Sequence, residues 1–328
     1  MFSGRGDNVP IEVFAFSHKA DVVKKSASGG AFSAIVEAFF SIYPTSQAVV
    51  YGVTLNENME AVYQSANTLE QCKKFQGSKY VRSNMRGIAE EITQKLQEGF
   101  TVLFSGTPCF VYALKTKLSQ WNAPTDKLLC IDLICHGTPE VKYWDAYKKF
   151  LEERSNSRLT QYQFRTHLPG KGPYTAIAEF ENGRKQIGTL ETALFNRLFL
   201  RHYTLAEGCF CCRFSNLERQ GDLTIGDFWG IEKVMPEFPN GKAVSEILVN
   251  TQKGVAVAQW MQNRADWDIQ RCMSMDFVRY QNNLQRPAEK PQDYAQFKQE
   301  FQNHGFKFVA KKYAGYDFLH RIKEKLCR

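Results

Sequence analysis

The sequence predicts a mixed α/β protein of the α+β type, because segments with helical and strand periodicity alternate along the 328-residue chain. Two apolar runs, 101–109 and 128–137, are typical of strands that are buried on both faces of a sheet. Phe32, Ile35 and Phe39 belong to an apolar set with helical spacing, which predicts a buried amphipathic helix over 31–43.

The other elements follow in the order of the chain. The run at 101–109 ends in a Gly-Thr-Pro turn that leads into a helix, and a second helix begins near Pro139. Asn182 and Gly183 join two strand-like segments, which predicts a tight hairpin. The remaining predicted elements are strands at 47–55, 222–230 and 244–250 and a linker at 285–293.

Composition limits the class of protein. With 43% hydrophobic and 23% charged residues, the chain has enough apolar material for one large core or two smaller ones. The N-terminus lacks the pattern of a secretory signal, and no apolar run reaches the roughly 18 residues of a membrane span. We therefore expect a cytoplasmic protein, whose cysteines serve metal binding, catalysis or packing rather than disulfides.

Positive charge is concentrated near the C-terminus. The chain carries a formal charge of +8, and residues 307–328 contain seven basic residues against two acidic ones. Phe318, Leu319, Ile322 and Leu326 would form one apolar stripe of a short helix there. The segment is either a solvated helix packed on the body or a docking site for an acidic protein or anionic lipid. Nucleic acid is not expected, because no basic cluster with interleaved aromatics matches a known reading module.

Four cysteines have positions that suit metal binding. Cys109 lies where a predicted strand turns into a helix, and Cys135 lies at the carboxyl end of the next buried strand. These places face the functional crevice of open α/β sheets. Cys209 and Cys212 add a C-x-x-C pair. Four thiolates suit a [4Fe–4S] cluster or a zinc ion, and ordinary packing stays an alternative at this point.

Six sequence motifs, taken together, carry a resemblance to a known family. They are SASGGAF (26–32), GSKYVRS (77–83), LFSGTPC (103–109), IDLICHGTP (131–139), CFCCRF (209–214) and LTIGDFWG (223–230), the last followed by VSEILVNT (244–251). In this order, across roughly 20–290, the sequence resembles the coenzyme F420 hydrogenase/dehydrogenase beta-subunit family. The resemblance implies a protein with FAD and a [4Fe–4S] cluster, which passes electrons to or from a hydride carrier such as a deazaflavin or an organic substrate. Relatives include chlorophyll-pathway reductases and proteins associated with polysaccharide gene clusters.

The resemblance implies a set of FAD-binding residues whose chemistry suits phosphate. Backbone N–H groups at the start of the 31–43 helix would hold a phosphate, although Ser28 acting as a plain helix cap is an alternative. Lys79 and Arg82 supply cations for the pyrophosphate or the flavin, unless the segment is only a solvated loop. The implied cofactor-binding residues are Ser28, Gly29, Gly30, Gly77, Ser78, Lys79, Tyr80, Arg82, Ser83, Gly106 and Thr107.

The resemblance also implies the redox and catalytic residues. Cys109, Cys135, Cys209 and Cys212 would bind the cluster. Flavin suits the position between cluster and substrate because a cluster passes single electrons whereas a nicotinamide or deazaflavin accepts a hydride. The implied catalytic residues are His136, Lys79 and Asp227.

Three features differ from the family pattern. Many relatives carry a ferredoxin-like module before the matched region, and this sequence has no such cysteine runs there. We therefore expect a separate ferredoxin-like electron donor, with the basic tail as its docking surface. Phe110 stands where the family usually has Gln, and Cys211 is additional to the usual pair. Either Cys211 or Cys212 would then be the fourth cluster ligand.

We expect three regions: a flavin-side segment at 1–95, a cluster-bearing domain at 96–290 and a basic tail at 291–328. Two further functional classes stay open. The first is a non-catalytic electron-transfer or assembly subunit, of the kind associated with polysaccharide biosynthesis. The second is a zinc-stapled binding protein without flavin.

Overall fold

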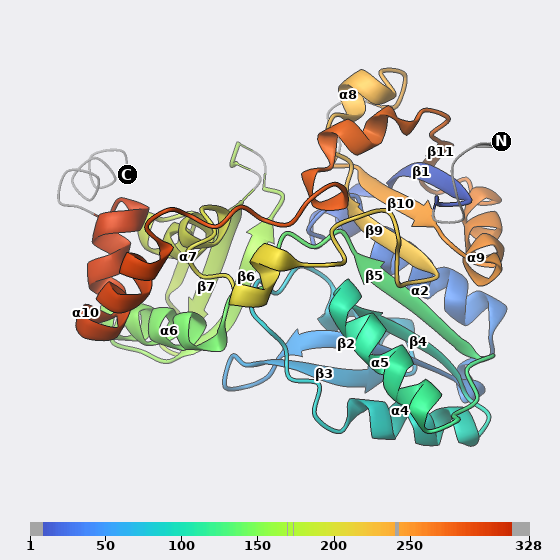
Figure 1. Ribbon diagram of the computed structural model, residues 1–328, viewed down its shortest axis with the longest axis horizontal. Helices are drawn as coiled ribbons and strands as arrows, with labels where there is room; N and C mark the ends of the chain where they lie inside the picture. The colour runs from blue at the N-terminus through green and yellow to red at the C-terminus, as the bar shows by residue number, and fades with distance from the viewer. Residues whose placement is uncertain (1–8, 169, 173, 240–242, 317–328) are drawn as a thin grey trace.

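The computed structural model describes residues 9–316 except 169, 173 and 240–242. An eight-stranded mixed sheet forms its centre, with strand order β11–β1–β10–β9–β5–β4–β2–β3 (Figure 1). The strands are β1 (Glu12–Ser17), β2 (Ala48–Leu55), β3 (Ala61–Ala66), β4 (Thr101–Gly106), β5 (Leu128–Leu133), β9 (Leu223–Asp227), β10 (Ser245–Val249) and β11 (Asp268–Arg271). All five strands predicted for this sheet are therefore confirmed, with shorter bounds.

The central strands run parallel and bring their carboxyl ends to one edge. β2, β4, β5 and β9 pair in parallel, whereas β3, β10, β1 and β11 extend the sheet with antiparallel pairs. At this edge β4 leads into the turn at 106–107 and β5 leads into the segment that contains Cys135. Ligands of open α/β sheets bind beyond such carboxyl ends.

Helices cover both faces of the large sheet. α2 (Ala31–Ile42) and α9 (Gln252–Gln262) pack together on one face, which confirms the helix predicted over 31–43. α4 (Ile88–Gln97) and α5 (Pro108–Gln120) cover the other face around Phe104 and Val102. Pro108 starts α5, where its missing N–H has no intrahelical partner to lose.

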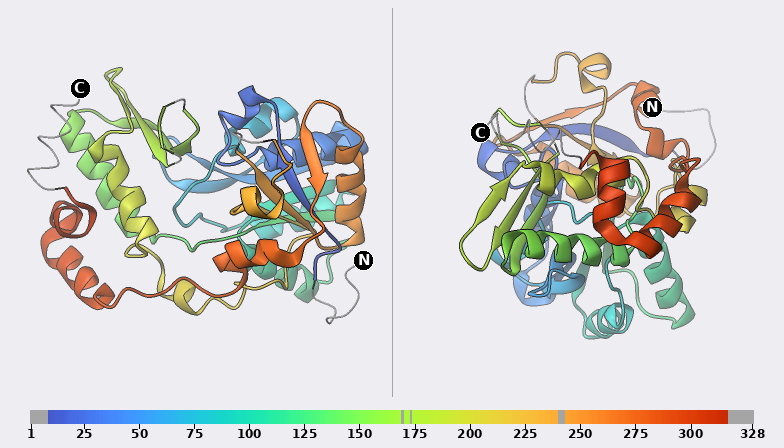
Figure 2. Two further views of the ribbon diagram at one scale, coloured as in Figure 1. Left: turned by 90° about the horizontal axis from the view of Figure 1, so that it is seen from above. Right: turned by 90° about the vertical axis from the view of Figure 1, so that its left-hand side faces the viewer.

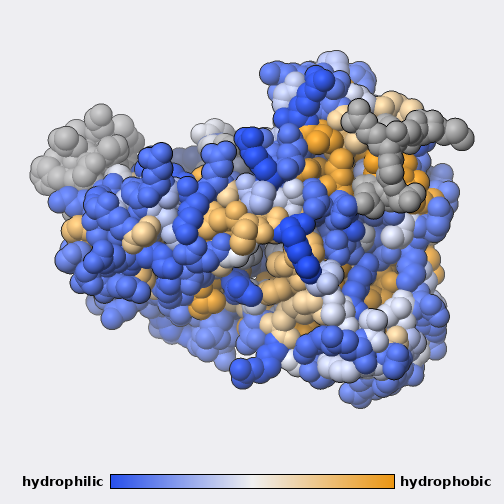
Figure 3. Space-filling view, viewed as in Figure 1, coloured by the Kyte–Doolittle hydropathy of each residue, from blue (hydrophilic) through white to orange (hydrophobic). Residues whose placement is uncertain are grey.

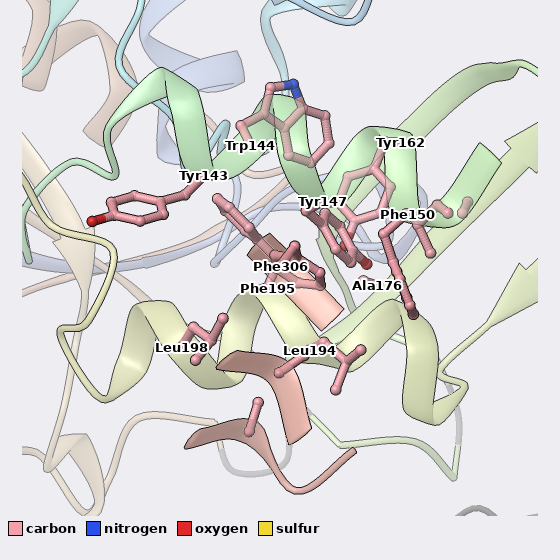
Figure 4. Packing of buried hydrophobic residues seen from close by; sticks show 14 of the residues in the cluster. Tyr143, Trp144, Tyr147, Phe150, Tyr162, Ala176, Leu194, Phe195, Leu198 and Phe306 are labelled. Atoms are coloured by element: carbon pink, nitrogen blue, oxygen red, sulfur yellow. The ribbon is translucent and has the colours of Figure 1, made fainter. Parts of the chain in front are cut away.

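A second unit packs beside the large sheet. It contains the antiparallel strands β6 (Leu159–Thr166), β7 (Thr175–Phe180) and β8 (Lys185–Ile187), together with α6 (Val141–Ser155), α7 (Leu190–Leu200) and α10 (Tyr294–Ala314). The hairpin predicted around Gly183 is confirmed, and this glycine has a φ of 78° in the turn. Trp144, Tyr147, Phe195 and Phe306 from three of these helices form its aromatic core (Figure 4).

Short elements complete the described chain. They are the α-helical turns α1 (Ala20–Val23), α3 (Leu69–Cys72) and α8 (Ile231–Val234), and the 3-10 segments η1 (Thr45–Gln47), η2 (Lys73–Phe75), η3 (Glu207–Cys211), η4 (Met275–Tyr280) and η5 (Asn282–Leu284). The predicted linker at 285–293 has neither helix nor strand, as expected.

Several features bear on the predicted regions. Strands from both sides of residue 95 share the large sheet, and α10 packs in the second unit at the end of the molecule opposite α9 (Figure 2). The division into regions 1–95, 96–290 and 291–328 stays a prediction. Phe318, Leu319, Ile322 and Leu326 lie outside the described residues. Within the described chain, no helix is both long and apolar enough to cross a membrane.

Candidate cofactor cavity and cysteine centre

A cavity of about 840 Å³ opens at the carboxyl edge of the large sheet. Its wall includes the start of α2, the segment 75–83, the ends of β4, β5 and β9, and the segment 280–289. The predicted residues in this wall are Ser28, Gly30, Gly77, Ser78, Lys79, Tyr80, Ser83, Gly106, Thr107, Cys135, His136 and Asp227. Gly29 and Arg82 are not among the described residues that line it.

The start of α2 is shaped for an anionic group. Gly30 is the N-cap residue, with a φ of 90° that favours glycine; it has no side chain to cap the helix, and the Ala31 N–H donates to the Ser245 hydroxyl oxygen at 3.5 Å. The Ser28 hydroxyl instead donates to the Val244 carbonyl at 2.9 Å, so the alternative in which Ser28 caps the helix is wrong. The first-turn residues Phe32 and Ser33 line the cavity, and their N–H groups are available to a ligand there.

Two glycines keep backbone close to neighbouring atoms. A Cβ on Gly106 would lie 2.5 Å from the Tyr63 hydroxyl oxygen, which is too close for any residue but glycine without a shift of Tyr63. A Cβ on Gly29 would lie 2.3 Å from the Phe16 carbonyl oxygen. Gly29 therefore lets the segment before α2 lie against the sheet, and Gly106 lets the Tyr63 hydroxyl approach the end of β4.

Lys79 lies in the cavity wall with its ammonium group held by its own segment. Nζ donates to the carbonyl oxygens of Lys74, Gln76 and Gly77 at 3.2, 2.8 and 3.2 Å. Burial lowers the pKa of Lys79 to about 7 because the charged form loses water. The same three bonds hold the segment 74–79 in the loop that forms this part of the wall.

An ion pair joins the two sheets across the cavity. Arg165 of β6 donates to the Asp227 carboxylate at the end of β9, with an Nη1–Oδ2 distance of 2.5 Å. The Arg165 guanidinium also lies over the Tyr174 ring at 4.9 Å. Next to this pair, Tyr80 stacks on Phe199 with a centroid distance of 4.7 Å. Asp227 is thus positioned by an arginine that the sequence analysis did not select.

His136 presents an unpaired ring nitrogen at the cavity wall. Its Nε2 is buried and has no hydrogen-bond partner among the described residues. Its ring packs against Phe199 and His202, with centroid distances of 5.2 and 4.7 Å. Burial, with a smaller contribution from His202, lowers the pKa of His136 to about 4, so the ring is neutral near pH 7.

Three of the four predicted metal-binding cysteines receive a hydrogen bond or contact from a nearby group. The Thr107 hydroxyl lies 3.2 Å from the Cys109 sulfur in the first turn of α5. The N–H groups of Gly137 and Thr138 donate to the sulfurs of Cys135 and Cys209, both at 3.4 Å. Such bonds stabilise thiolates and tune the potential of a bound cluster.

The four thiols lie close enough to affect one another electrostatically. Burial, with smaller contributions from the charges of Cys109, Cys209 and Cys212, raises the pKa of Cys135 to about 12, although a hydrogen bond from the Gly137 N–H opposes the shift. Cys211 is exposed, and its sulfur faces the Gly208 carbonyl oxygen at 3.7 Å. In the part of the chain that the structure describes, no three histidine, cysteine or carboxylate side chains converge as tightly as ligands of one metal ion.

A buried ion pair anchors the loop that carries the last two cysteines. The Arg219 guanidinium lies 3.2 Å from the Asp132 carboxylate of β5, and both side chains are at most 1% exposed. Arg219 also donates to the carbonyl oxygens of Leu133 and Phe214 at 2.9 Å. One side chain thus ties the loop after Cys212 to the strand that leads to Cys135.

Comparison with known proteins identifies the class. A family model for the C terminus of the beta subunit of coenzyme F420 hydrogenase/dehydrogenase matches residues 100–273. Because this match covers more than half of the chain, the protein belongs to this family of hydrogenase and dehydrogenase beta subunits. The resemblance inferred from the six motifs is confirmed.

A solved structure agrees with this assignment at the level of fold. The chain is similar to one in the F420-reducing [NiFe] hydrogenase complex from Methanosarcina barkeri, with a TM-score of 0.57 and 15% sequence identity. The similarity covers 94% of this chain and 97% of the other. No curated protein sequence matches the chain.

Sequence reasoning missed several residues of the cavity. Arg165 and His202 line it, as do residues 280–289. Arg165 is buried between Phe164 and Thr166 near the end of β6, but the largely polar sequence of that strand gives no sign that this side chain is enclosed. No sequence pattern indicated His202. Within the segment 280–289, residues 285–289 belong to the predicted linker, so no ligand-binding role was expected there.

Proposed function

We propose that the protein is an iron–sulfur flavoprotein oxidoreductase that exchanges electrons with a hydride-accepting coenzyme of the deazaflavin type or with an organic substrate. Cys109, Cys135, Cys209 and Cys212 would hold a [4Fe–4S] cluster, and the 840 Å³ cavity would hold FAD. One observation carries the proposal. Cys135 belongs both to the group of interacting thiols and to the cavity wall, so the two sites adjoin at this residue.

The cavity fits a dinucleotide with a flat ring system. The free N–H groups at the start of α2 suit a phosphate, and the aromatic rings of Tyr63, Tyr80 and Phe199 in the cavity wall suit a flat ring system. The cluster would supply single-electron transfer and the flavin would supply hydride transfer. Within this cavity His136 would offer its neutral Nε2 to a polar atom of the ligand, because that nitrogen is buried without a partner.

The arrangement of the thiols favours a cluster over zinc. A zinc ion holds sulfur ligands at about 2.3 Å, which draws four thiols tightly together. The described side chains do not converge in this way. A four-iron cluster is larger and spaces its four thiolates farther apart, and the N–H···S contacts at Cys135 and Cys209 suit cluster sulfurs. Cys212, whose charge acts on Cys109 and Cys135, is the proposed fourth ligand.

The test compares two adjacent cysteines. Cys212→Ser and Cys211→Ser are purified and reconstituted anaerobically beside the wild type, and iron is measured with the visible spectrum. We expect Cys212→Ser to lose most of its iron and its absorbance near 400 nm, whereas Cys211→Ser keeps both. Equal retention of iron in the two variants would show that the proposed ligand set is wrong.

A further inference from the structure

The cysteine centre has an inner side and an outer side. Cys135 lies in the wall of the cavity, whereas Cys109 and Cys211 are exposed. We call residues 207–214, which carry Cys209, Cys211 and Cys212, the cysteine loop. Figure 1 shows this loop, in yellow, on the face toward the viewer and close to the segment 285–293. A group held by the four thiols would therefore be accessible from solvent on the side of Cys109 and Cys211.

An aromatic and cationic stack lies beside the outer side. Tyr112, one turn after Cys109 on α5, is 39% exposed. The Arg213 guanidinium, next in sequence to Cys212, lies over the Tyr112 ring at 4.2 Å and over the Phe214 ring at 5.0 Å. None of the ion pairs among the described residues includes Arg213, so its charge is presented to solvent.

Further cations surround the cysteine loop. Arg82 is exposed, and its guanidinium lies 5.9 Å from the ring centre of Phe110, the residue that follows Cys109. At the other end of the loop, Lys290 and Lys298 share the single carboxylate of Glu207, at 2.7 and 3.2 Å. We define Arg82, Arg213, Lys290 and Lys298 as the cationic rim; it keeps an excess of positive charge over Glu207.

We propose that the cationic rim is the docking surface for an acidic electron-carrier protein. The proposal rests on the proposed function, because it assumes that the thiols hold a redox group. Complementary charge speeds and orients association, and the exposed Tyr112 ring, with the half-buried Phe214 ring beside it, supplies contact area between the cations. Figure 3, drawn from the same side as Figure 1, shows strongly hydrophilic residues bordering apolar ones in the middle of this face. Docking there leaves the cavity free for the electron acceptor.

This surface shares only Lys298 with the predicted tail region 291–328 and includes none of the basic residues of 307–328. In the described part of that tail, Lys312 is paired with Glu300 at 2.6 Å. α10 lies at the end of the molecule opposite α9 (Figure 2). Lys312 belongs to its last turns, whereas Lys290, just before α10, and Lys298, in its first turns, both pair with Glu207 of the cysteine loop. Electron transfer falls off with distance, so a carrier bound at the cysteine loop is better placed than one bound at the tail.

The test uses charge reversal with a matched control. The variant Arg213→Glu/Lys290→Glu/Lys298→Glu leaves Arg82 intact because that residue is a predicted cofactor contact. The control Lys127→Glu/Lys149→Glu/Lys185→Glu changes the net charge by the same amount. Its three lysines are exposed and lie directly before β5, on α6 and on β8, respectively. Binding of a purified bacterial two-cluster ferredoxin with net negative charge is measured by calorimetry on the reconstituted proteins. Reduction by that ferredoxin and by reduced methyl viologen is followed separately.

We expect the rim variant to bind the ferredoxin at least about 10-fold more weakly than wild type at low ionic strength, with the control within about 2-fold of wild type. Added salt should weaken wild-type binding toward that of the variant. Viologen should reduce all three proteins equally. Equal ferredoxin binding by all three, or no binding by any, overturns the docking proposal. If viologen fails to reduce the wild type, the proposed function fails, whatever the binding result.

Discussion

At the scale of single residues, Glu246 is a buried carboxyl group with an energetic consequence. It is 0% exposed on β10, its Oε1 has no partner among the described residues, and its Oε2 accepts from Gln281. Burial raises its pKa to about 8 from the usual 4.5, although Gln281 and the charge of Arg219 oppose the shift. Between these two pH values the native state keeps a proton that the unfolded chain has lost. This group therefore stabilises the fold fully below about pH 4.5, and the contribution is lost as the pH rises to 8.

Glu246→Gln should remove this pH dependence, because the amide has the same shape but does not ionise. The measurement is urea unfolding of both proteins at pH 5.5, 7.0 and 8.5. We expect the difference in the free energy of unfolding, variant minus wild type, to increase by roughly 1–3 kcal/mol from pH 5.5 to pH 8.5. A difference that stays constant with pH would mean that Glu246 is ionised in the native state throughout.

At this scale the sequence revealed residues with strong chemical identity and missed residues that depend on distant partners. Cys135 and Gly106 could be placed because each follows a recognisable buried strand. Glu246 and Arg165 could not, since their environments come from Gln281 and Asp227, which lie 35 and 62 positions away.

At the scale of elements, α10 belongs to the core of the second unit and is not a detachable tail. Val309, Ala310 and Tyr313 are at most 5% exposed against α6 and α7. Arg201 and Arg197 donate to the Tyr313 and Ala314 carbonyl oxygens at the end of the helix, at 2.6 and 3.0 Å. The sequence pattern emphasised the charge of 307–328 and did not indicate this buried face.

Two truncations separate the parts of the former tail. The chain without 317–328 serves as the reference. Removing 307–328 should lower the melting temperature strongly or prevent folding, because each large apolar side chain lost from a core costs roughly 1.5–3 kcal/mol out of a total stability of about 5–15 kcal/mol. Thermal unfolding followed by circular dichroism compares the two. Equal melting temperatures would show that the packing of α10 contributes little stability.

At the scale of the whole molecule, the cavity arises between two units that the sequence predicts only in part. The buried parallel strands were predictable because their apolar runs are continuous. No strand was predicted at β1, which pairs with β10 more than 200 residues away. The Arg165–Asp227 pair and the contact between His167 Nε2 and the Ala27 carbonyl, at 3.0 Å, join the second unit to the cavity wall. The periodicity of a local sequence window contains no information about contacts between residues so far apart in the chain.

The central claim is that a cluster site and a flavin site adjoin at Cys135. The most direct measurement is analysis of iron, acid-labile sulfide, zinc and flavin in the full chain after anaerobic purification and reconstitution. The account predicts about four irons and four sulfides with one FAD per chain. Stoichiometric zinc without flavin would contradict it and would indicate a binding protein whose thiols have a structural role.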